Sequence, residues 1–310
     1  MNDELPGCIR FSPFIIHHFL VWVWPVIIEV ISKPNGVDDM LKNKRLAVLG
    51  CGKLGETLIK GLLEAGVIEV TNVIVTAGHQ QRLEQMRERF GVAGTLSNKA
   101  AAESADIIIL AVKPQTVPSV VSEISDVLRP AKMLISVAAS VSAAFIEKHL
   151  SAPVPVIRAM PNTPCELKKG MTGIAPGSNA GREHVALAKF IFDAVGRTVV
   201  VDEKHMDAIT GLSASGPAYI YIIIESLAEA GVKVGLPRDI ATELAAQTVV
   251  GAGSMVLETA EHPAKLKDMV TTPAGCTIDG ILELEEGGLR VTLIKAVVKA
   301  TQRAKELLET

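Results

Sequence analysis

The sequence contains few cysteines. They are scattered, with no Cys-x-x-Cys pair and no histidine at the spacing of a metal ligand: Cys8, Cys51, Cys165 and Cys276. Because disulfide frameworks and zinc sites need a regular set of cysteines or histidines, the sequence predicts neither of them. We therefore expect no metal site and a reducing, cytoplasmic location.

The chain also lacks an excess of positive charge. Its formal net charge is -3, and 21% of its residues are charged against 48% that are hydrophobic. Surfaces that bind nucleic acid or an anionic membrane are basic, so we expect neither partner. With 310 residues of ordinary globular composition, the chain is long enough for two domains.

A hydrophobic run at residues 14–31 raises the question of a signal peptide or membrane segment. Acidic Asp3 and Glu4 precede the run where a signal peptide has positive charge, and Glu29 interrupts it. We interpret residues 1–43 as an N-terminal extension, which includes the alternative of a misassigned start. A membrane anchor and a packing or partner segment are the other two interpretations of this part of the chain.

The segment around residue 50 has the pattern of a nucleotide-binding turn. An apolar run at residues 46–49 is typical of a buried parallel strand, and residues 57–65 have the apolar face of a helix. Between them lie Gly50, Gly52 and Gly55, spaced as GxGxxG. The first glycine permits a tight turn, the second lets a pyrophosphate approach the backbone, and the third lets the helix pack closely. The residues expected to bind a dinucleotide here are Gly50, Cys51, Gly52, Lys53, Leu54 and Gly55.

Short apolar runs alternate with amphipathic stretches as far as residue 201, which is typical of repeated βα units. Strands are expected at residues 46–49, 72–76, 107–112, 133–137, 154–160, 172–175 and 198–201. After Asp202 long helical patterns follow, and three prolines, Pro217, Pro237 and Pro263, break them. The expected fold is α/β: a Rossmann-like, mostly parallel sheet in residues 44–203, followed by an all-helical domain in residues 204–310.

The second expected strand ends without an acidic residue. In an NAD site an Asp or Glu at this point binds the ribose 2′-hydroxyl and repels the 2′-phosphate of NADP. Residues 75–80 contain neither, which favours NADPH, with NADH as a possible second cofactor. Thr76, His79 and Arg82 are candidates for contact with the 2′-phosphate, although an arginine early in a helix is commonly a solvated residue.

The third expected strand runs into Ala111-Val112-Lys113-Pro114. These residues follow the carboxyl end of a strand, where ligands of open α/β sheets bind. Small residues and a proline suit a flat wall against a cofactor, so all four are candidates. Lys113 alternatively is a solvated charge at the start of a helix.

The helical half contains one segment suited to a small acid, at residues 272–277. Thr272 and Pro273 have the pattern of a helix N-cap followed by proline at the first helical position. The backbone N–H groups that follow would lack helical partners and would form an anion cradle at the positive end of the helix. The residues expected to bind the acid are Thr272, Ala274, Gly275, Cys276 and Thr277. The alternative is a capped helix start that binds nothing.

Several motifs together give the sequence a resemblance to the pyrroline-5-carboxylate reductase family. They are the glycine turn, residues 111–114, Met160-Pro-Asn-Thr-Pro164, residues 207–219 and residues 266–285. The last two are highly specific, and the similarity spans about residues 44–308. The resemblance implies reduction of L-1-pyrroline-5-carboxylate to L-proline with NAD(P)H, the last step of proline biosynthesis. It also implies a helical dimerisation domain, and dimers that can assemble into a ring.

The mechanism that follows is direct hydride transfer to the C=N carbon of the substrate. Backbone donors of residues 274–277 would hold the carboxylate, and the Thr277 hydroxyl would bond the ring nitrogen as the catalytic group. Since a protonated cyclic imine is already electrophilic, positioning and exclusion of water would supply most of the catalysis. Two alternative interpretations stay open. One is a related imine or β-hydroxyacid reductase, and the other is a non-enzymatic NADPH-binding protein.

Two positions depart from the family pattern. Ala274 stands where many members have glycine, and Ser140 ends a turn that many members end with glycine. The second turn is expected to approach the nicotinamide ribose. The remaining residues expected to bind the cofactor are Thr76, Asn98, Ala138 and Ala139.

Overall fold

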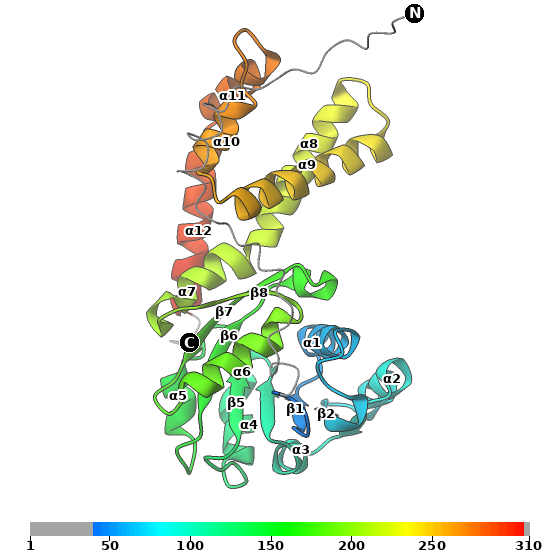
Figure 1. Ribbon diagram of the computed structural model, residues 1–310, viewed down its shortest axis with the longest axis vertical. Helices are drawn as coiled ribbons and strands as arrows, with labels where there is room; N and C mark the ends of the chain where they lie inside the picture. Colours follow the sequence, from blue (N-terminus) through cyan, green and yellow to red (C-terminus); the bar gives the residue numbers. More distant parts are fainter. Residues whose placement is uncertain (1–39, 307–310) are drawn as a thin grey trace, which may run out of the picture. The chain divides into compact units, whose positions relative to one another are not determined.

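The computed structural model describes residues 40–306, so the expected N-terminal extension lies almost wholly outside the described residues. Residues 40–306 contain one eight-stranded sheet of order β3-β2-β1-β4-β5-β6-β7-β8 (Figure 1). All neighbouring strands are parallel except β6 and β7. The strands are β1 (Leu46–Leu49), β2 (Val73–Thr76), β3 (Ala93–Thr95), β4 (Ile107–Leu110), β5 (Met133–Ser136), β6 (Val156–Met160), β7 (Gly170–Pro176) and β8 (Gly196–Val200).

Helices cover both faces of this sheet because the neighbouring strands β1 and β4 are apolar at every position. In β1, Leu46 and Val48 belong to a core shared with α1, α2 and α6, whereas Ala47 and Leu49 belong to a core shared with α3, α4 and α5. Alternate side chains of a strand point to opposite faces, so an unbroken apolar run is buried on both sides. These helices are α1 (Lys53–Glu64), α2 (Gln80–Phe90), α3 (Asn98–Ser104), α4 (Val117–Ile124), α5 (Ala143–Lys148) and α6 (Arg182–Asp193).

After β8 the described chain is helical, as expected. Gly216 begins α8, Pro237 caps the start of α9, and Pro263 is the first residue of α10, so the three predicted breaks are confirmed. The elements are α7 (Met206–Ile209), a π-helical turn (Thr210–Ala214), α8 (Gly216–Lys233), α9 (Arg238–Thr259), α10 (Pro263–Met269), α11 (Cys276–Glu286) and α12 (Leu289–Glu306).

A buried ion pair connects the sheet to the first of these helices. Arg158 of β6 is 3% exposed, and its Nη2 lies 2.9 Å from Oδ1 of Asp207 in α7. Its Nη1 lies 3.8 Å from Oε1 of Glu203. Because a buried guanidinium is costly to leave unpaired, this contact holds α7 against β6.

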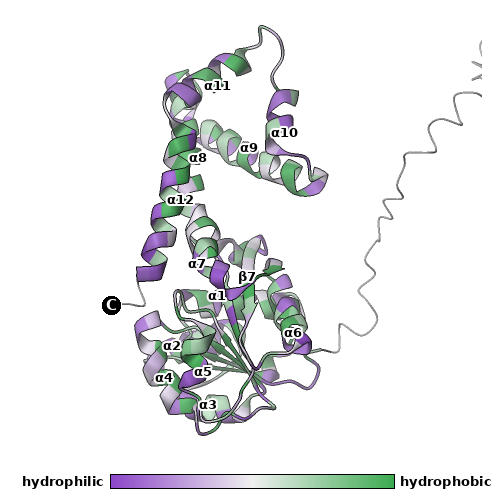
Figure 2. Cartoon of the chain, turned by 90° about the vertical axis from the view of Figure 1, so that its left-hand side faces the viewer, coloured by the Kyte–Doolittle hydropathy of each residue, from purple (hydrophilic) through white to green (hydrophobic). Residues whose placement is uncertain are grey.

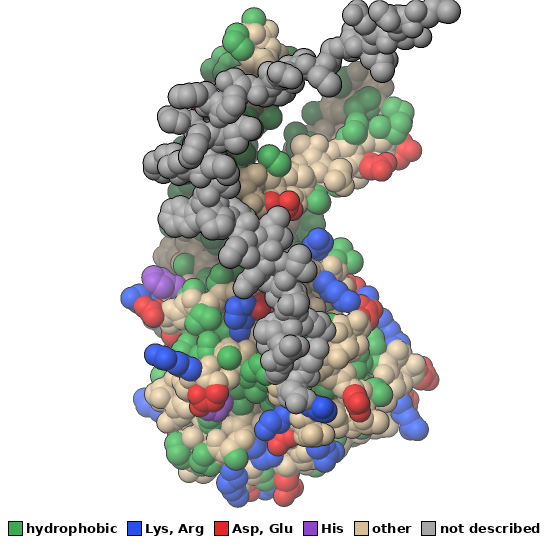
Figure 3. Space-filling view, viewed as in Figure 1, with side chains coloured by type: hydrophobic (Ala, Val, Ile, Leu, Met, Phe, Trp, Pro, Cys, Tyr) green, Lys and Arg blue, Asp and Glu red, His purple; other side chains and the backbone are tan. Residues whose placement is uncertain are grey.

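The helical half exposes many large apolar side chains in the single chain. Figure 2 shows hydrophobic stretches along α8 and α9, and in Figure 3 charged side chains are concentrated over the sheet half instead. A surface of this kind on one chain marks a site of association. Examples with more than half of their surface exposed are Tyr221, Ile222, Leu244, Leu257, Leu282, Ile294 and Val298.

By length and composition alone, α9 is the one helix among residues 40–306 that could cross a membrane. It packs against α8, and only 11% of its most apolar window is buried in the single chain. The same exposed apolar surface would serve a contact with another helix pair.

Two details of the sheet half differ from expectation. The strand β3 was not predicted, because Ala-Gly-Thr carries no β signal and the strand depends on its pairing with β2. Helix α1 begins at Lys53, four residues before the predicted start at residue 57, because Gly52 serves as its N-cap.

Candidate functional site

The three glycines of the β1–α1 turn have the backbone geometry that their GxGxxG spacing predicts. Gly50 has φ +87°, and an added Cβ would lie 2.5 Å from Cγ1 of Val112. A side chain on Gly55 would lie 3.0 Å from the Gly50 carbonyl oxygen. Gly52 has no heavy atom within 4 Å of an added Cβ, so its outer side is open. The turn is therefore tight on its inner side and accessible where a pyrophosphate would approach.

The helix that follows this turn offers free donors. The first intrahelical bond runs from Glu56 N to Gly52 O at 3.0 Å. The N–H groups of Lys53, Leu54 and Gly55 therefore have no carbonyl one turn back, and they share the positive end of the α1 dipole. These are the groups that would bind phosphate oxygens.

Thr76 and Asn98 hold the turn from the neighbouring strand. Gly50 N donates to Thr76 Oγ1 at 3.0 Å, and Thr76 Oγ1 donates to Asn98 Oδ1 at 2.7 Å. Thr76 is only 2% exposed, so its hydroxyl is already used within the protein. Asn98 Nδ2 in turn donates to Glu123 Oε2 at 2.8 Å. The three residues form one hydrogen-bond chain that ends at the glycine turn.

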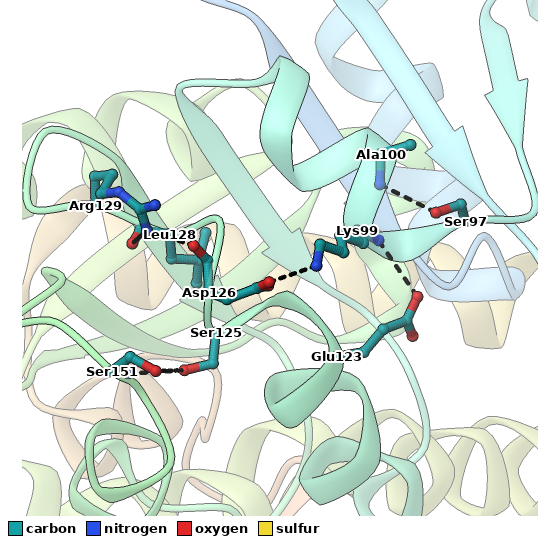
Figure 4. A network of polar contacts seen from close by, with 9 residues as sticks. All are labelled: Ser97, Lys99, Ala100, Glu123, Ser125, Asp126, Leu128, Arg129 and Ser151. Carbon is teal, nitrogen blue, oxygen red and sulfur yellow. Dashed lines mark hydrogen bonds and ion pairs between the residues drawn. The ribbon is translucent and has the colours of Figure 1, made fainter.

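The start of α3 is fixed in the same region. Ser97 caps the helix by accepting from Ala100 N at 3.1 Å, and Lys99 N donates to Glu123 Oε1 at 3.3 Å (Figure 4). Lys99 also pairs with Asp126, which follows α4. Asn98 is the first residue of α3, and contacts of its two sequence neighbours, Ser97 and Lys99, fix its position.

The end of β2 carries no acidic residue, and the three candidates for a 2′-phosphate differ in availability. His79 is the exposed N-cap residue of α2 and its side chain makes no cap bond. Arg82 Nε donates to the Cys51 carbonyl oxygen at 2.9 Å, and its Nη2 pairs with Glu56. Of the three, only His79 is both exposed and uncommitted to a described contact in this region.

The other expected cofactor residues lie at the carboxyl ends of β4 and β5. Ala111 N donates to Leu49 O at 2.8 Å, and Val112 packs against Gly50, so this segment lies beside the glycine turn. Lys113 is exposed and caps a short 3-10 helix that begins at Pro114. Ala138 and Ala139 follow β5, the next strand in the sheet. All the candidates from these strands thus face one edge of the sheet.

The turn after β5 is strained at its last residue. Ser140 has φ +66°, the left-handed region in which glycine is preferred, and it is 1% exposed. Its Oγ has no hydrogen-bond partner within the described part of the chain. The departure from the family pattern at this position therefore has a local conformational cost.

A cavity beside the glycine turn is lined by two expected cofactor residues, Lys53 and Leu54, and by six residues that the sequence did not assign to the site. The cavity has a volume of about 210 Å³ and is bounded by Lys53, Leu54, Thr57, Pro161, Asn162, Thr163, Glu166 and Ala214. Asn162 Nδ2 donates to Ser213 O at 3.2 Å, and its Oδ1 accepts from Met171 N at 2.9 Å. The motifs at residues 160–164 and 207–219 are the sequence signals for this side of the site.

The thiol in the glycine turn is inert. Cys51 is 2% exposed, and burial raises its pKa to about 11, with the nearby Arg82 opposing that shift and Glu56 adding to it. It is therefore a protonated packing residue near neutral pH.

The predicted helix start at Thr272 is wrong. Helix α11 begins at Cys276 with Gly275 as its N-cap, and residues 272–275 form a turn in which Gly275 N donates to Thr272 O at 3.0 Å. One of the expected anion donors, Gly275 N, is therefore used by the turn. The free donors move to the first turn of α11, which contains the partly buried Thr277.

This turn places a non-glycine residue in the left-handed region. Ala274 has φ +57° and lies at the third position of the turn. A side chain on Gly275 would meet Thr272 Oγ1 at 2.4 Å. The segment therefore requires glycine at 275 and would favour it at 274.

Within one chain the two halves of the expected site are separate. The cavity beside the glycine turn includes no residue of 272–277. Helix α11 packs against α12, and α10 packs against α9. In Figure 1, α11 lies at the end of the helical half that is away from β1. The sheet half brings the cofactor candidates together at one edge of the sheet. The substrate candidates, residues 272–277, lie in the helical half and outside that cavity.

Comparisons with known proteins match both halves. Residues 203–307 match the family described as pyrroline-5-carboxylate reductase dimerisation, and residues 45–140 match NADP oxidoreductase, coenzyme F420-dependent. The pyrroline-5-carboxylate reductase of Methanosarcina acetivorans is 43% identical over 267 residues, which covers 86% of this chain and 99% of the relative.

Solved structures agree with these matches. A pyrroline-5-carboxylate reductase from Coxiella burnetii has a TM-score of 0.79 at 36% identity, covering 85% of this chain and 98% of its own. A Plasmodium falciparum pyrroline carboxylate reductase with NADP bound has a TM-score of 0.77 at 31% identity, with coverage of 85% and 97%.

The hydrogen-bond chain through Thr76 yields a stability prediction. Thr76→Val keeps the shape but leaves Gly50 N and Asn98 Oδ1 without a partner, so the free energy of unfolding should fall by ~1–3 kcal/mol. Thr76→Ser keeps the hydroxyl and is the matched control. Urea denaturation of both variants measures the difference, and an equal loss in the two would show that the hydroxyl does not hold the turn.

Proposed function

The chain belongs to the pyrroline-5-carboxylate reductase family, and from this premise we propose that it reduces L-1-pyrroline-5-carboxylate to L-proline with NADPH, the last step of proline biosynthesis. The supporting observation is the pairing of an open glycine turn with a second helix start suited to a small acid. The relatives cover nearly the whole described chain, which includes both halves of the proposed site.

The residues around the glycine turn fit the cofactor. The open side of Gly52 leaves room for a pyrophosphate, and the N–H groups of Lys53 and Leu54 at the start of α1 would donate to it. When bound, NADPH supplies a hydride to the imine carbon, and the ring nitrogen keeps the proton it carries. Ala111, Val112 and the neighbouring turn after β5 would line the nicotinamide end.

The preference for NADPH rests on charge. Residues 76–80, at and after the end of β2, include no Asp or Glu, so nothing acidic there repels a 2′-phosphate. NADH lacks that phosphate and would bind through the same turn more weakly. His79, which is exposed, is our candidate for the contact.

The substrate would lie at the start of α11. Its carboxylate would accept from the first N–H groups of the helix, including those of Cys276 and Thr277, at the positive end of the dipole. The Thr277 hydroxyl would bond the ring nitrogen and orient the imine. The protein then contributes orientation and exclusion of water, and no strong acid is required.

We propose that a second copy completes each site. The apolar faces of α8, α9 and α12 are exposed in one chain, and the turn at 272–275 lies apart from the glycine turn. Burying those faces against a partner would bring the partner's α11 to the cofactor. We accordingly propose residues 44–203 as the cofactor domain and 204–310 as the dimerisation and substrate domain, in a cytoplasmic dimer or a ring of dimers.

The activity is tested by adding pyrroline-5-carboxylate to the purified full chain with NADPH and following absorbance at the NADPH band. We expect oxidation of NADPH with formation of proline. Thr277→Val should lower kcat at least about tenfold, since it removes one hydrogen bond to the reacting group, with little change in NADPH affinity. Tight NADPH binding without turnover in the unaltered chain would refute the proposal, and equal losses in kcat and NADPH affinity would place Thr277 elsewhere.

The strain at Ala274 gives a separate prediction. The left-handed region costs a residue with a Cβ roughly 1–2 kcal/mol that glycine is spared, so Ala274→Gly should stabilise the turn and lower the KM for the imine by up to about fivefold. Ala274→Val should raise that KM, because a β-branched residue suits the region worse. Steady-state kinetics at saturating NADPH measures both, and a KM that moves the same way in the two variants would contradict this account.

A further inference from the structure

The side chain of Arg82 has a more specific arrangement than a solvated arginine or a free phosphate ligand would have. It lies in the first turn of α2 and its side chain is 27% exposed. Its Nε donates to the Cys51 carbonyl oxygen at 2.9 Å, its Nη1 donates to Gln85 Oε1 at 3.2 Å, and its Nη2 pairs with Glu56. Each nitrogen of the guanidinium is thus occupied within the protein.

These contacts fix one residue of the glycine turn at both ends. Cys51 N donates to Thr76 O at 2.7 Å, while Cys51 O accepts from Arg82. The peptide unit is planar, so holding the Cys51 carbonyl also fixes the orientation of the bond that leads into Gly52. The backbone of Gly52 and the N–H groups of the residues after it are then held in one orientation.

Arg82 also pairs with an acidic residue of α1, Glu56. Glu56 lies in the first turn of that helix, with 18% of its side chain exposed, beside the place where a pyrophosphate would bind. An unpaired carboxylate there would repel the phosphates. Arg82 and Arg89 both pair with Glu56, so the acid is neutralised from two sides.

We propose that Arg82 is a positioning residue for the pyrophosphate turn and does not read the ribose 2′-phosphate. It clamps the Cys51 carbonyl and neutralises Glu56, and both effects act on the part of the cofactor that NADPH and NADH share. The inference rests on the proposed use of a nicotinamide dinucleotide. By this proposal Arg82 affects how tightly both cofactors bind and does not affect which of NADPH and NADH is preferred.

The test measures the Kd of NADPH and of NADH for the full chain by isothermal titration calorimetry. Arg82→Met keeps an apolar stem and removes every donor, and it should weaken both cofactors by roughly tenfold, leaving the ratio of the two Kd values within about twofold of the original. Arg89→Met is the matched control, because it removes an exposed partner of Glu56 without touching Cys51. It should change either Kd by less than about twofold.

Three results would overturn the proposal. NADPH weakened with NADH unchanged would make Arg82 the reader of the 2′-phosphate. No change in either Kd would show that the bond from Arg82 to the Cys51 carbonyl does not affect cofactor binding. Equal losses of affinity in Arg82→Met and Arg89→Met would show that only neutralisation of Glu56 matters. Arg82→Lys, which keeps the charge but cannot span both partners, serves the same purpose if thermal unfolding shows that Arg82→Met is not folded. An unaltered chain that binds neither nucleotide would instead contradict the proposed function.

Discussion

The close approach of the β1–α1 turn to the end of β4 is the constraint on which the cofactor half depends. Gly50 adopts a positive φ and leaves no room for a side chain against Val112, and Gly55 lets α1 lie on the turn. Once these contacts are made, Thr76 can accept from Gly50 N and join it to Asn98. Contacts within the chain therefore hold the donors at the start of α1 in one arrangement, which lowers the ordering free energy that binding of a ligand would cost.

The helical half follows a different principle, because its apolar surface is not covered within one chain. Its helices pack pairwise, and their remaining large apolar side chains face outward. The α11 helix start that suits a small acid belongs to this half and lies apart from the glycine turn. Association of two chains would bury the exposed apolar side chains and would also bring the α11 helix start of one chain to the glycine turn of the other. The same contact would then form both a hydrophobic core and the site.

The parts of the structure that could be predicted are those encoded locally. The GxGxxG spacing, the apolar run of β1 and the prolines at the starts of α9 and α10 each act over a few residues. Thr272-Pro273 misled the prediction because the same pair that can cap a helix here forms a turn, which delays α11 until Cys276. Strand β3, the bond between Asn162 and Ser213 and the bond from Arg82 to the Cys51 carbonyl each join residues distant in sequence, and a single sequence does not show which distant residues pair.

Complementation between two inactive variants tests most directly whether each site is built from two chains. One variant carries Gly50→Val, which closes the glycine turn, and the other carries Thr277→Val. If subunits exchange at random, half of the dimers are mixed and each contains one intact site, so the mixture should recover about a quarter of the original activity. A mixture no more active than the sum of its separate components would show that each site lies within a single chain, and would contradict this account.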